Sequence, residues 1–335
     1  MGYDQVPMAD ALVDRFQRKH TYLRISVTDR CNFRCRYCMP PDGLEWRARD
    51  EILSFEEIDR LARLFARLGV DKIRLTGGEP TVRKGIDELI GKLSAIPGVD
   101  SLLMTTNGTT LASQASAYRR AGLTGLNVSL DSLRRERFTE ITLRDELSRV
   151  LAGIDAAIDA GFESVKVNVV VMAGVNDDEL LDFVEFARSR PINVRFIEFM
   201  PFDGNGWKPV SVLPYREMRS RIESIFALKP IATAAEAVGK DFGIEGFLGT
   251  IGFVTSMTES FCDGCNRVRL TAEGAFKPCL FSGSETSLRD PMRAGASDDD
   301  LEAIVRQALA GKWKGHPPMN LLASFPNRSL VAIGG

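Results

Sequence analysis

Three cysteines lie close together near the start of the chain, at Cys31, Cys35 and Cys38. Their C-x3-C-x2-C spacing puts three thiols in one short loop, directly after an apolar, strand-like run over 22–27. Iron–sulfur clusters are held by cysteine thiolates, and four thiolates would saturate the irons of a cubane. Three thiolates therefore predict a 4Fe-4S cluster with one iron open to another ligand. A structural zinc site and three unrelated buried thiols are the alternatives, although zinc spacings favour C-x2-C pairs.

A second group of three cysteines, Cys262, Cys265 and Cys279, has the spacing C-x2-C-x13-C. It again supplies three thiolates, which predicts a second 4Fe-4S cluster with one non-cysteine position. Zinc remains the alternative for this group. A Cys3His zinc site would need His20 or His316, and both are distant in sequence.

Two arginines follow the second cysteine pair at alternate positions, Arg267 and Arg269. Side chains two apart share a face of an extended segment, so both guanidinium groups would point the same way. Guanidinium binds phosphate in a bidentate manner, which predicts a phosphorylated substrate beside this cysteine group. The alternative is that both are solvated surface arginines.

Composition narrows the class of protein. The chain has 335 residues, 44% of them hydrophobic, and its 43 Lys and Arg against 45 Asp and Glu give a net charge of −2. This balance predicts neither a disordered chain nor a nucleic-acid-binding surface. No apolar run reaches the roughly 18 residues of a membrane helix. All six cysteines fall into the two groups, which favours metal binding in a reducing, cytoplasmic compartment over disulfides.

Periodicity beyond the first cysteine loop predicts alternating helices and strands. Ser54 and Glu57 match a capping box, apolar residues follow at helical spacing over 55–68, and Gly69 stands where a helix would end. Helices are also expected over 149–160 and 176–188, and before Gly122. Six β/α units in this order predict parallel strands with right-handed crossovers. The expected strands are 22–27, 72–76, 101–106, 126–130, 164–171 and 193–200.

The side chains of these strands favour an incomplete barrel over a doubly wound sheet. Residues two apart share a face, and one face would be apolar, as at Ile73 and Val128. The other face carries many polar side chains, and so many could not be buried in a dry interior. They fit the lining of a wide, partly open (βα)6 barrel covered outside by helices. The polar face would carry Arg24, Ser26, Thr28, Lys72, Arg74, Thr76, Thr105, Asn107, Asn127, Ser129, Asp131, Lys166 and Asn168.

The β/α alternation stops in a segment rich in Pro and Gly over 201–214, where we expect a domain boundary. We predict an N-terminal arm over 1–19, the partial barrel over 20–205, and a C-terminal domain over 206–335 that carries the second cluster, substrate contacts and a Gly-Gly tail. Within the last part we expect a helix over 215–227 and a strand over 247–256, whereas 229–246 is not diagnostic.

The loops after the strands carry further candidates, because parallel α/β folds place their sites at strand C-termini. Gly77, Gly78 and Glu79 follow the second strand, where paired glycines would allow close approach of the backbone to a ligand. Alone, this motif is a tight turn. After a C-x3-C-x2-C loop, it resembles the motif of the radical S-adenosylmethionine (SAM) enzymes.

That resemblance implies an open iron that chelates the amino acid part of SAM, and an electron that cleaves SAM to a 5′-deoxyadenosyl radical. It implies an α/β radical-SAM barrel as the fold. It also implies SAM contacts at Gly77, Gly78, Glu79, Tyr37, Ser129 and Met200.

A narrower resemblance rests on the two cysteine groups, the Cys-Asn-Arg-Val-Arg run after the second pair and the final Gly-Gly. Together, over about residues 20–335, they resemble the GTP 3′,8-cyclases of molybdenum cofactor biosynthesis, the MoaA family. The implied reaction abstracts the ribose 3′-hydrogen of GTP and joins C3′ to guanine C8, giving 3′,8-cyclo-7,8-dihydro-GTP. The second cluster would bind the guanine. The implied GTP contacts are Arg24, Arg74, Thr105, Lys166, Arg267, Val268 and Arg269.

The same resemblance implies that Arg195 belongs to the basic pocket and that Gly334 and Gly335 reach into the active site and assist the reaction. It implies two further partners, an external electron donor and a downstream cyclic pyranopterin monophosphate synthase, and a homodimer is among the assemblies that the sequence allows. Two alternatives stay open. One is a peptide-modifying radical-SAM maturase, although its auxiliary region usually has more cysteines, and the other is a non-catalytic nucleotide sensor with structural metal sites.

Overall fold

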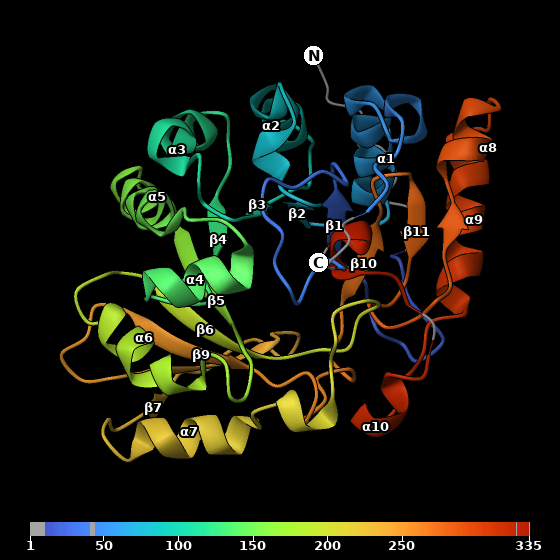
Figure 1. Ribbon diagram of the computed structural model, residues 1–335. Coiled ribbons are helices and arrows are strands. Elements are labelled where there is room, and N and C mark those ends of the chain that lie inside the picture. The colour runs from blue at the N-terminus through green and yellow to red at the C-terminus, as the bar shows by residue number, and fades with distance from the viewer. Residues whose placement is uncertain (1–10, 41–43, 326, 335) are drawn as a thin grey trace.

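The computed structural model describes residues 11–40, 44–325 and 327–334. Six parallel strands form its centre and confirm the predicted series. They alternate with helices that cover the outer side of the sheet (Figure 1). The strands are β1 (Tyr22–Ser26), β2 (Lys72–Thr76), β3 (Ser101–Thr106), β4 (Gly125–Ser129), β5 (Ser164–Val171) and β6 (Asn193–Glu198). The helices between them are α1 (Phe55–Arg67), α2 (Ile86–Ser94), α3 (Leu111–Arg120), α4 (Arg135–Thr142), α5 (Leu147–Asp159) and α6 (Leu180–Phe186).

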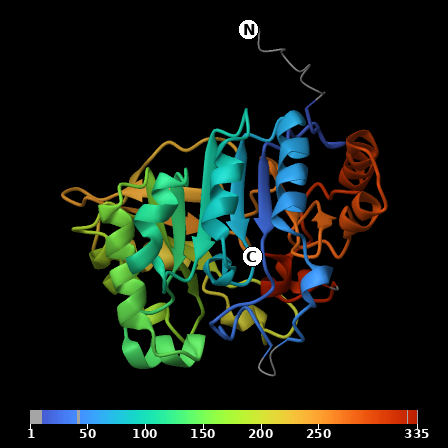
Figure 2. The same cartoon turned by 90° about the horizontal axis from the view of Figure 1, so that it is seen from above.

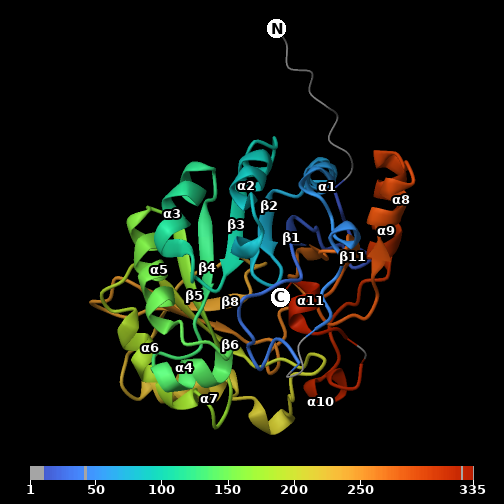
Figure 3. The ribbon, with the colours of Figure 1, turned by 45° about the horizontal axis from the view of Figure 1, so that its top comes forward.

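The C-terminal part of the chain extends this sheet at both edges. β9 (Thr250–Val254) pairs in parallel with β6, and β10 (Arg267–Leu270) pairs in parallel with β1. Antiparallel strands then complete a single sheet in the order β12-β11-β10-β1-β2-β3-β4-β5-β6-β9-β8-β7. Figures 1 and 3 show that this sheet is curved, as in an incomplete barrel. The added strands are β7 (Lys229–Pro230), β8 (Gly239–Gly243), β11 (Ala275–Lys277) and β12 (Thr286–Ser287).

Helix α1 illustrates how local sequence signals fix the elements. The Ser54 hydroxyl accepts a hydrogen bond from the Glu57 amide at 3.1 Å, and the Glu57 carboxylate accepts one from the Ser54 amide at 2.7 Å. This reciprocal pairing satisfies two free amides at the helix start. Gly69, with φ of +89°, follows the last turn in a conformation that favours glycine. The capping box and both ends of the predicted helix are confirmed to within one residue.

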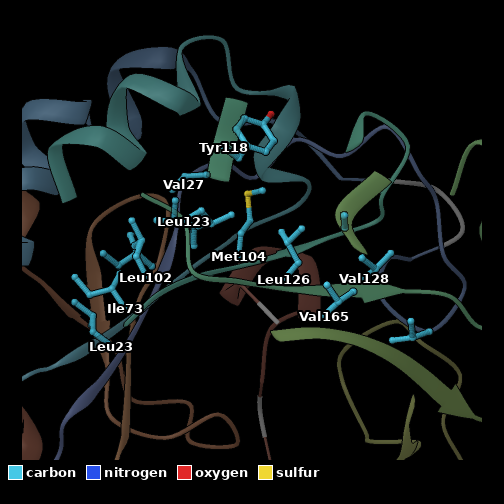
Figure 4. Packing of buried hydrophobic residues seen from close by; sticks show 14 of the residues in the cluster. Leu23, Val27, Ile73, Leu102, Met104, Tyr118, Leu123, Leu126, Val128 and Val165 are labelled. Atoms are coloured by element: carbon cyan, nitrogen blue, oxygen red, sulfur yellow. The ribbon is translucent and has the colours of Figure 1, made fainter. Parts of the chain in front are cut away.

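The apolar faces of the parallel strands form the main core beneath the helices. Figure 4 shows side chains from neighbouring strands, among them Leu23, Ile73, Met104 and Val128, packed against one another. All four are fully buried. The predicted division of each strand into an apolar outer face and a polar inner face is therefore confirmed on the outer side, and the inner side is left to line the barrel.

One expected helix differs from the structure at its start, and one stretch for which no element was expected contains strands. The segment 176–188 begins with a 3-10 turn over Asp177–Glu179 before α6, because the buried Glu179 carboxylate accepts hydrogen bonds from Ser132 and the Leu133 amide at 2.7 Å each. The non-diagnostic stretch 229–246 contains β7 and β8, which pair with each other. The remaining helices are α7 (Tyr215–Glu223), α8 (Arg289–Arg293), α9 (Asp298–Ala310), α10 (Met319–Leu322) and α11 (Leu330–Ile333).

The close approach of the loops after β1 and β2 generates a stability prediction. A Cβ on Gly78 would lie 2.2 Å from the Arg30 carbonyl oxygen, so Gly78→Ala must push two backbone segments apart. We expect a loss of about 1–3 kcal/mol, the usual cost of overpacking, seen as a lower thermal unfolding midpoint. Gly91→Ala in α2 is the matched control, because no atom lies within 4 Å of its added Cβ. The control should be neutral or stabilising, and an equal loss in both variants would contradict the explanation.

Candidate active site

The first cysteine loop leaves β1 and packs against α4. The amides of Arg34 and Arg36 donate to the carbonyls of Thr142 and Ile141 at 3.0 Å, which fixes the loop. Burial raises the pKa of Cys31 to about 11, and it also raises the pKa of Cys35 and Cys38. Each of the three thiols is only partly exposed and none is in a disulfide. Buried thiolates need positive partners, and cluster iron would provide them, so this donor set fits a cluster.

Gly77 and Gly78 serve contacts between protein segments. The Gly78 amide donates to the Thr28 carbonyl at 2.7 Å, and the Glu79 amide donates to the Arg30 carbonyl at 2.8 Å. The loop after β2 thus supports the chain just before the first cysteine. The close approach that we expected toward a ligand is made here toward residues 28–30, and SAM contacts from the two glycines stay a prediction.

Glu79 is almost fully buried, and its carboxylate accepts hydrogen bonds from the Asn107 amide at 2.6 Å and the Thr106 hydroxyl at 2.7 Å. Thr81 donates to the same carboxylate from its amide at 3.1 Å and its hydroxyl at 2.7 Å. Glu79 therefore joins the loops after β2 and β3. The sequence motif did not reveal this structural role.

One cavity brings together half of the predicted site residues. On the side of the first cysteine loop it is lined by Tyr37, Ser129 and Met200, the positions expected around SAM. Asp131, just beyond β4, lies with them; its carboxylate accepts a hydrogen bond from the Val170 amide at 2.9 Å and pairs with the Tyr37 hydroxyl. Burial raises the pKa of Asp131 to about 6. Sequence reasoning placed Asp131 on the polar face but did not name it as a site residue.

The second cysteine group, Cys262, Cys265 and Cys279, lines the same cavity. The β10–β11 pairing brings Cys279 back toward the other two. Burial opposes ionisation of Cys265, but the nearby Arg267 and Lys312 outweigh it and lower its pKa to about 6. A thiol that ionises readily is a suitable metal or cluster ligand. Within the described ranges, no group of three or more Cys, His, Asp or Glu side chains is placed to hold a single metal ion.

Basic residues from neighbouring strands lie side by side along the inner face. Parallel pairing puts Arg24 opposite Arg74 of β2 on one side and opposite Arg269 of β10 on the other. Further along the sheet, Asn127 is paired with Thr105 and Lys166. Arg24, Thr105, Arg195, Arg267 and Arg269 line the cavity, and Arg74 and Lys166 belong to the same rows.

These cations are held in an environment that disfavours their charge. Burial and then Arg269 lower the pKa of Arg24 to about 9, and burial and then Arg195 lower the pKa of Lys166 to about 8. Nη1 of Arg269 is buried and has no hydrogen-bond partner in the described part of the chain. Buried like charges destabilise one another unless an anion lies between them. The arrangement therefore favours a multiply charged anionic ligand.

Two predicted contacts differ from the others in their surroundings. Val268 is fully buried and is paired with the core residue Leu23, so any contact it makes to a ligand would come from its main chain. Arg195 lines the cavity and forms an ion pair with Asp241, with 3.4 Å between Nη2 and Oδ2. Asp241 is a carboxylate among cations, and sequence reasoning gave no signal for it.

The end of the chain docks beside the first cysteine loop. The Val331 amide donates to the Cys38 carbonyl at 3.4 Å, and Leu330 lines the cavity. Figures 2 and 3 show the red helix α11 near the ends of β1 and β2. A Cβ on Gly334 would lie 2.7 Å from Ser26 Cβ and 2.8 Å from Thr76 Oγ1, so only glycine fits there without displacement. Gly335 lies outside the described residues.

Comparison with known families supports this geometry. Residues 25–187 match the radical SAM superfamily, and residues 192–318 match the Molybdenum Cofactor Synthesis C family. Solved structures share the fold at low identity. SuiB of Streptococcus suis bound to the precursor peptide SuiA aligns with a TM-score of 0.60 at 14% identity, covering 94% of this chain and 70% of that chain. Native anSMEcpe with bound AdoMet aligns at 0.58 and 16%, covering 90% and 83%.

Curated relatives are much closer in sequence. The mitochondrial GTP 3′,8-cyclase of Arabidopsis thaliana is 50% identical over 98% of this chain and 85% of its own length. The GTP 3′,8-cyclase of Moorella thermoacetica is 44% identical over 96% and 99%. Molybdenum cofactor biosynthesis protein 1 of Homo sapiens is 44% identical over 98% of this chain, which spans 52% of that protein. The chain therefore belongs to the GTP 3′,8-cyclase family within the radical SAM superfamily.

Proposed function

We propose that this chain converts GTP to 3′,8-cyclo-7,8-dihydro-GTP, the first step of molybdenum cofactor biosynthesis. The observation that carries the proposal is one cavity lined both by residues expected around SAM and by the second cysteine group. Tyr37, Ser129 and Met200 line it, and so do Cys262, Cys265 and Cys279. Both relatives named GTP 3′,8-cyclase above are similar to this chain over nearly its whole length.

A 4Fe-4S cluster at the first cysteine group, with SAM, would supply a 5′-deoxyadenosyl radical that removes the ribose 3′-hydrogen of GTP. The chain's own contribution is binding and orientation. Arg24, Arg267 and Arg269 can offset the triphosphate charge from adjacent strands. A fixed triphosphate limits which ribose hydrogen faces the first cysteine loop, and correct positioning supplies much of the selectivity. The C3′ radical would then add to guanine C8, and one electron from the external donor and one proton would convert the resulting ring radical to the 7,8-dihydro product.

The second cysteine group would hold a second 4Fe-4S cluster, whose non-cysteine position could take the guanine. Cys265 supports this because its thiol ionises readily beside Arg267 and Lys312. A cavity between the barrel strands and the C-terminal strands would also limit access of water and other hydrogen donors.

Other parts of the proposal rest on the sequence and the family. They are the division into an arm over 1–19, a barrel over 20–205 and a C-terminal domain over 206–335, a reductant protein, a downstream cyclic pyranopterin monophosphate synthase, a homodimer, and a cytoplasmic location. In the described residues no helix is long and apolar enough to span a membrane.

The deciding experiment is anaerobic incubation of the reconstituted protein with SAM, a reductant and each nucleoside triphosphate in turn, with products identified by mass. Among the nucleoside triphosphates, we expect only GTP to give a cyclised product. SAM cleavage without any consumption of GTP would overturn the proposal and would favour a different radical SAM substrate, such as a peptide.

Removing single thiolates should separate the roles of the two cysteine groups. Cys35→Ser should abolish reductive SAM cleavage, because it removes a thiolate from the group where SAM would bind. Cys279→Ser should reduce GTP binding and cyclisation more than SAM cleavage. Iron content and 5′-deoxyadenosine are the measurements. Complete loss of SAM cleavage in the Cys279 variant, with the first cluster retained, would show that the roles are not independent.

Truncating the arginines of β10 should test phosphate recognition. Arg269→Ala should raise the Kd for GTP roughly 10- to 150-fold, since a charge-assisted hydrogen bond is worth about 1.5–3 kcal/mol. The loss should shrink for guanosine, which has no phosphate groups. Arg216→Ala, at a side chain that is 88% exposed on α7, is the control and should bind GTP normally. An equal loss for GTP and guanosine would exclude phosphate recognition.

The glycine near the chain end should be required for chemistry but not for cofactor binding. Gly334→Ala should displace the tail from Ser26 and Thr76 and abolish cyclised product, while iron content and SAM binding stay at wild-type values. Gly295→Ala is the matched control: Gly295 has φ of +94°, but no atom lies within 4 Å of an added Cβ. Equal activity of the two variants would mean that the close fit of Gly334 is not needed.

A further inference from the structure

A buried lysine lies behind the second cysteine group. Lys312 follows α9 and is only 3% exposed. Its ammonium nitrogen donates to the carbonyls of Arg267 at 2.7 Å and Pro278 at 2.8 Å, and it lies 3.7 Å from the Cys265 sulfur. An ammonium group has three donors. These three partners therefore account for its full hydrogen-bonding capacity.

The partners of Lys312 are placed on both segments that carry the second cysteine group. Arg267 comes two residues after Cys265, and Pro278 directly precedes Cys279. The Lys312 side chain, which comes from a third segment, therefore links the start of β10 to the residue that follows β11. The short β10–β11 ladder is a second link between these two segments.

A second cation holds the remaining cysteine. Arg18 donates to the carbonyl of Cys262 at 2.7 Å and to those of Trp313 and Lys314 at 2.7 and 2.6 Å. Its Nε donates to the buried Asp14 carboxylate at 2.7 Å, which fixes the guanidinium. Arg18 therefore joins the N-terminal segment, the Cys262 loop and the Lys312 segment.

Charge distinguishes Lys312 from Arg18. Arg18 is neutralised by Asp14, whereas Lys312 makes no ion pair with a carboxylate in the part of the chain that the structure describes. A buried ammonium without a counter-charge is costly. Among its contacts in the described residues, the Cys265 sulfur at 3.7 Å is a group that can carry negative charge. Lys312 is suited to hold this sulfur as a thiolate.

We propose that Lys312 is a positioning residue for the second cysteine group, braced by Arg18, and that its charge stabilises the reduced state of the cluster bound there. The inference rests on the second cluster of the proposed function. Hydrogen bonds to ligating sulfurs and nearby charge tune the potential of iron–sulfur clusters. A positive charge beside the sulfur favours addition of an electron, so removal of that charge lowers the reduction potential.

The test uses the full-length chain with Cys31, Cys35 and Cys38 changed to Ser, so that the second group alone holds iron. Into this background we would introduce Lys312→Met, which removes the charge and the donors, and Lys312→Arg, which keeps the charge. Lys314→Met is the matched control, because Lys314 is exposed and its carbonyl bond to Arg18 is retained. The measurements are iron per chain, the rate of iron loss to a chelator, and the reduction potential by anaerobic titration with electron paramagnetic resonance.

We expect Lys312→Met to lose iron several-fold faster and to have a more negative potential, with partial recovery in Lys312→Arg and no change in Lys314→Met. Unchanged iron loss and potential in Lys312→Met would overturn the inference while leaving the second cluster in place. Absence of iron from the background variant itself would instead overturn the second cluster of the proposed function. If Lys312→Met does not fold, Arg18→Gln replaces it for the rate of iron loss, and a wild-type rate there would overturn the brace.

Discussion

The constraint on which the site depends is the burial of several positive charges next to one another. Arg24 lies between Arg74 and Arg269 on adjacent strands, and burial together with this repulsion lowers its pKa. Such an arrangement is unfavourable in the free protein. It is tolerated because the sheet holds the residues in register from both sides and because the cavity can admit an anion. Stability of the fold and affinity for a polyanion therefore act against each other at this place.

The two faces of the sheet have different roles: the outer face stabilises the fold, and the inner face carries the charged residues. The outer face supplies a continuous apolar core, where residues such as Leu23, Ile73 and Val128 are fully buried beneath helices. Because alternate residues of the same strands point inward, the rigid core fixes the positions of the charged residues. The inner face carries the unfavourable repulsion between the buried cations. It does not have to be closely packed, because solvent and ligand can fill the cavity.

Much of this division could be predicted from sequence, because it is local. The capping box at Ser54, the strand periodicity and the polar inner rows depend on residues within a few positions of one another. The pairing of β10 with β1 could not be predicted in this way. It brings Arg24 next to Arg269, which is more than half of the chain away in sequence. A local sequence pattern does not indicate which edge strand a distant segment will pair with. The roles of Glu79 and Lys312 were missed for the same reason, since their partners come from distant segments.

The position of the tail follows from the same long-range pairing. Arg328 forms ion pairs with Glu273 and Glu285, both in the segment that includes β11 and β12, and so anchors the chain just before α11. Val331 and Ile333 are almost fully buried, and Gly334 then reaches Ser26 and Thr76 at the ends of β1 and β2. The segment that follows the second cysteine group therefore ends beside the first. The docked tail therefore depends on the pairing of β10 with β1, and the same pairing brings the second cysteine group to the cavity that Tyr37 of the first cysteine loop lines.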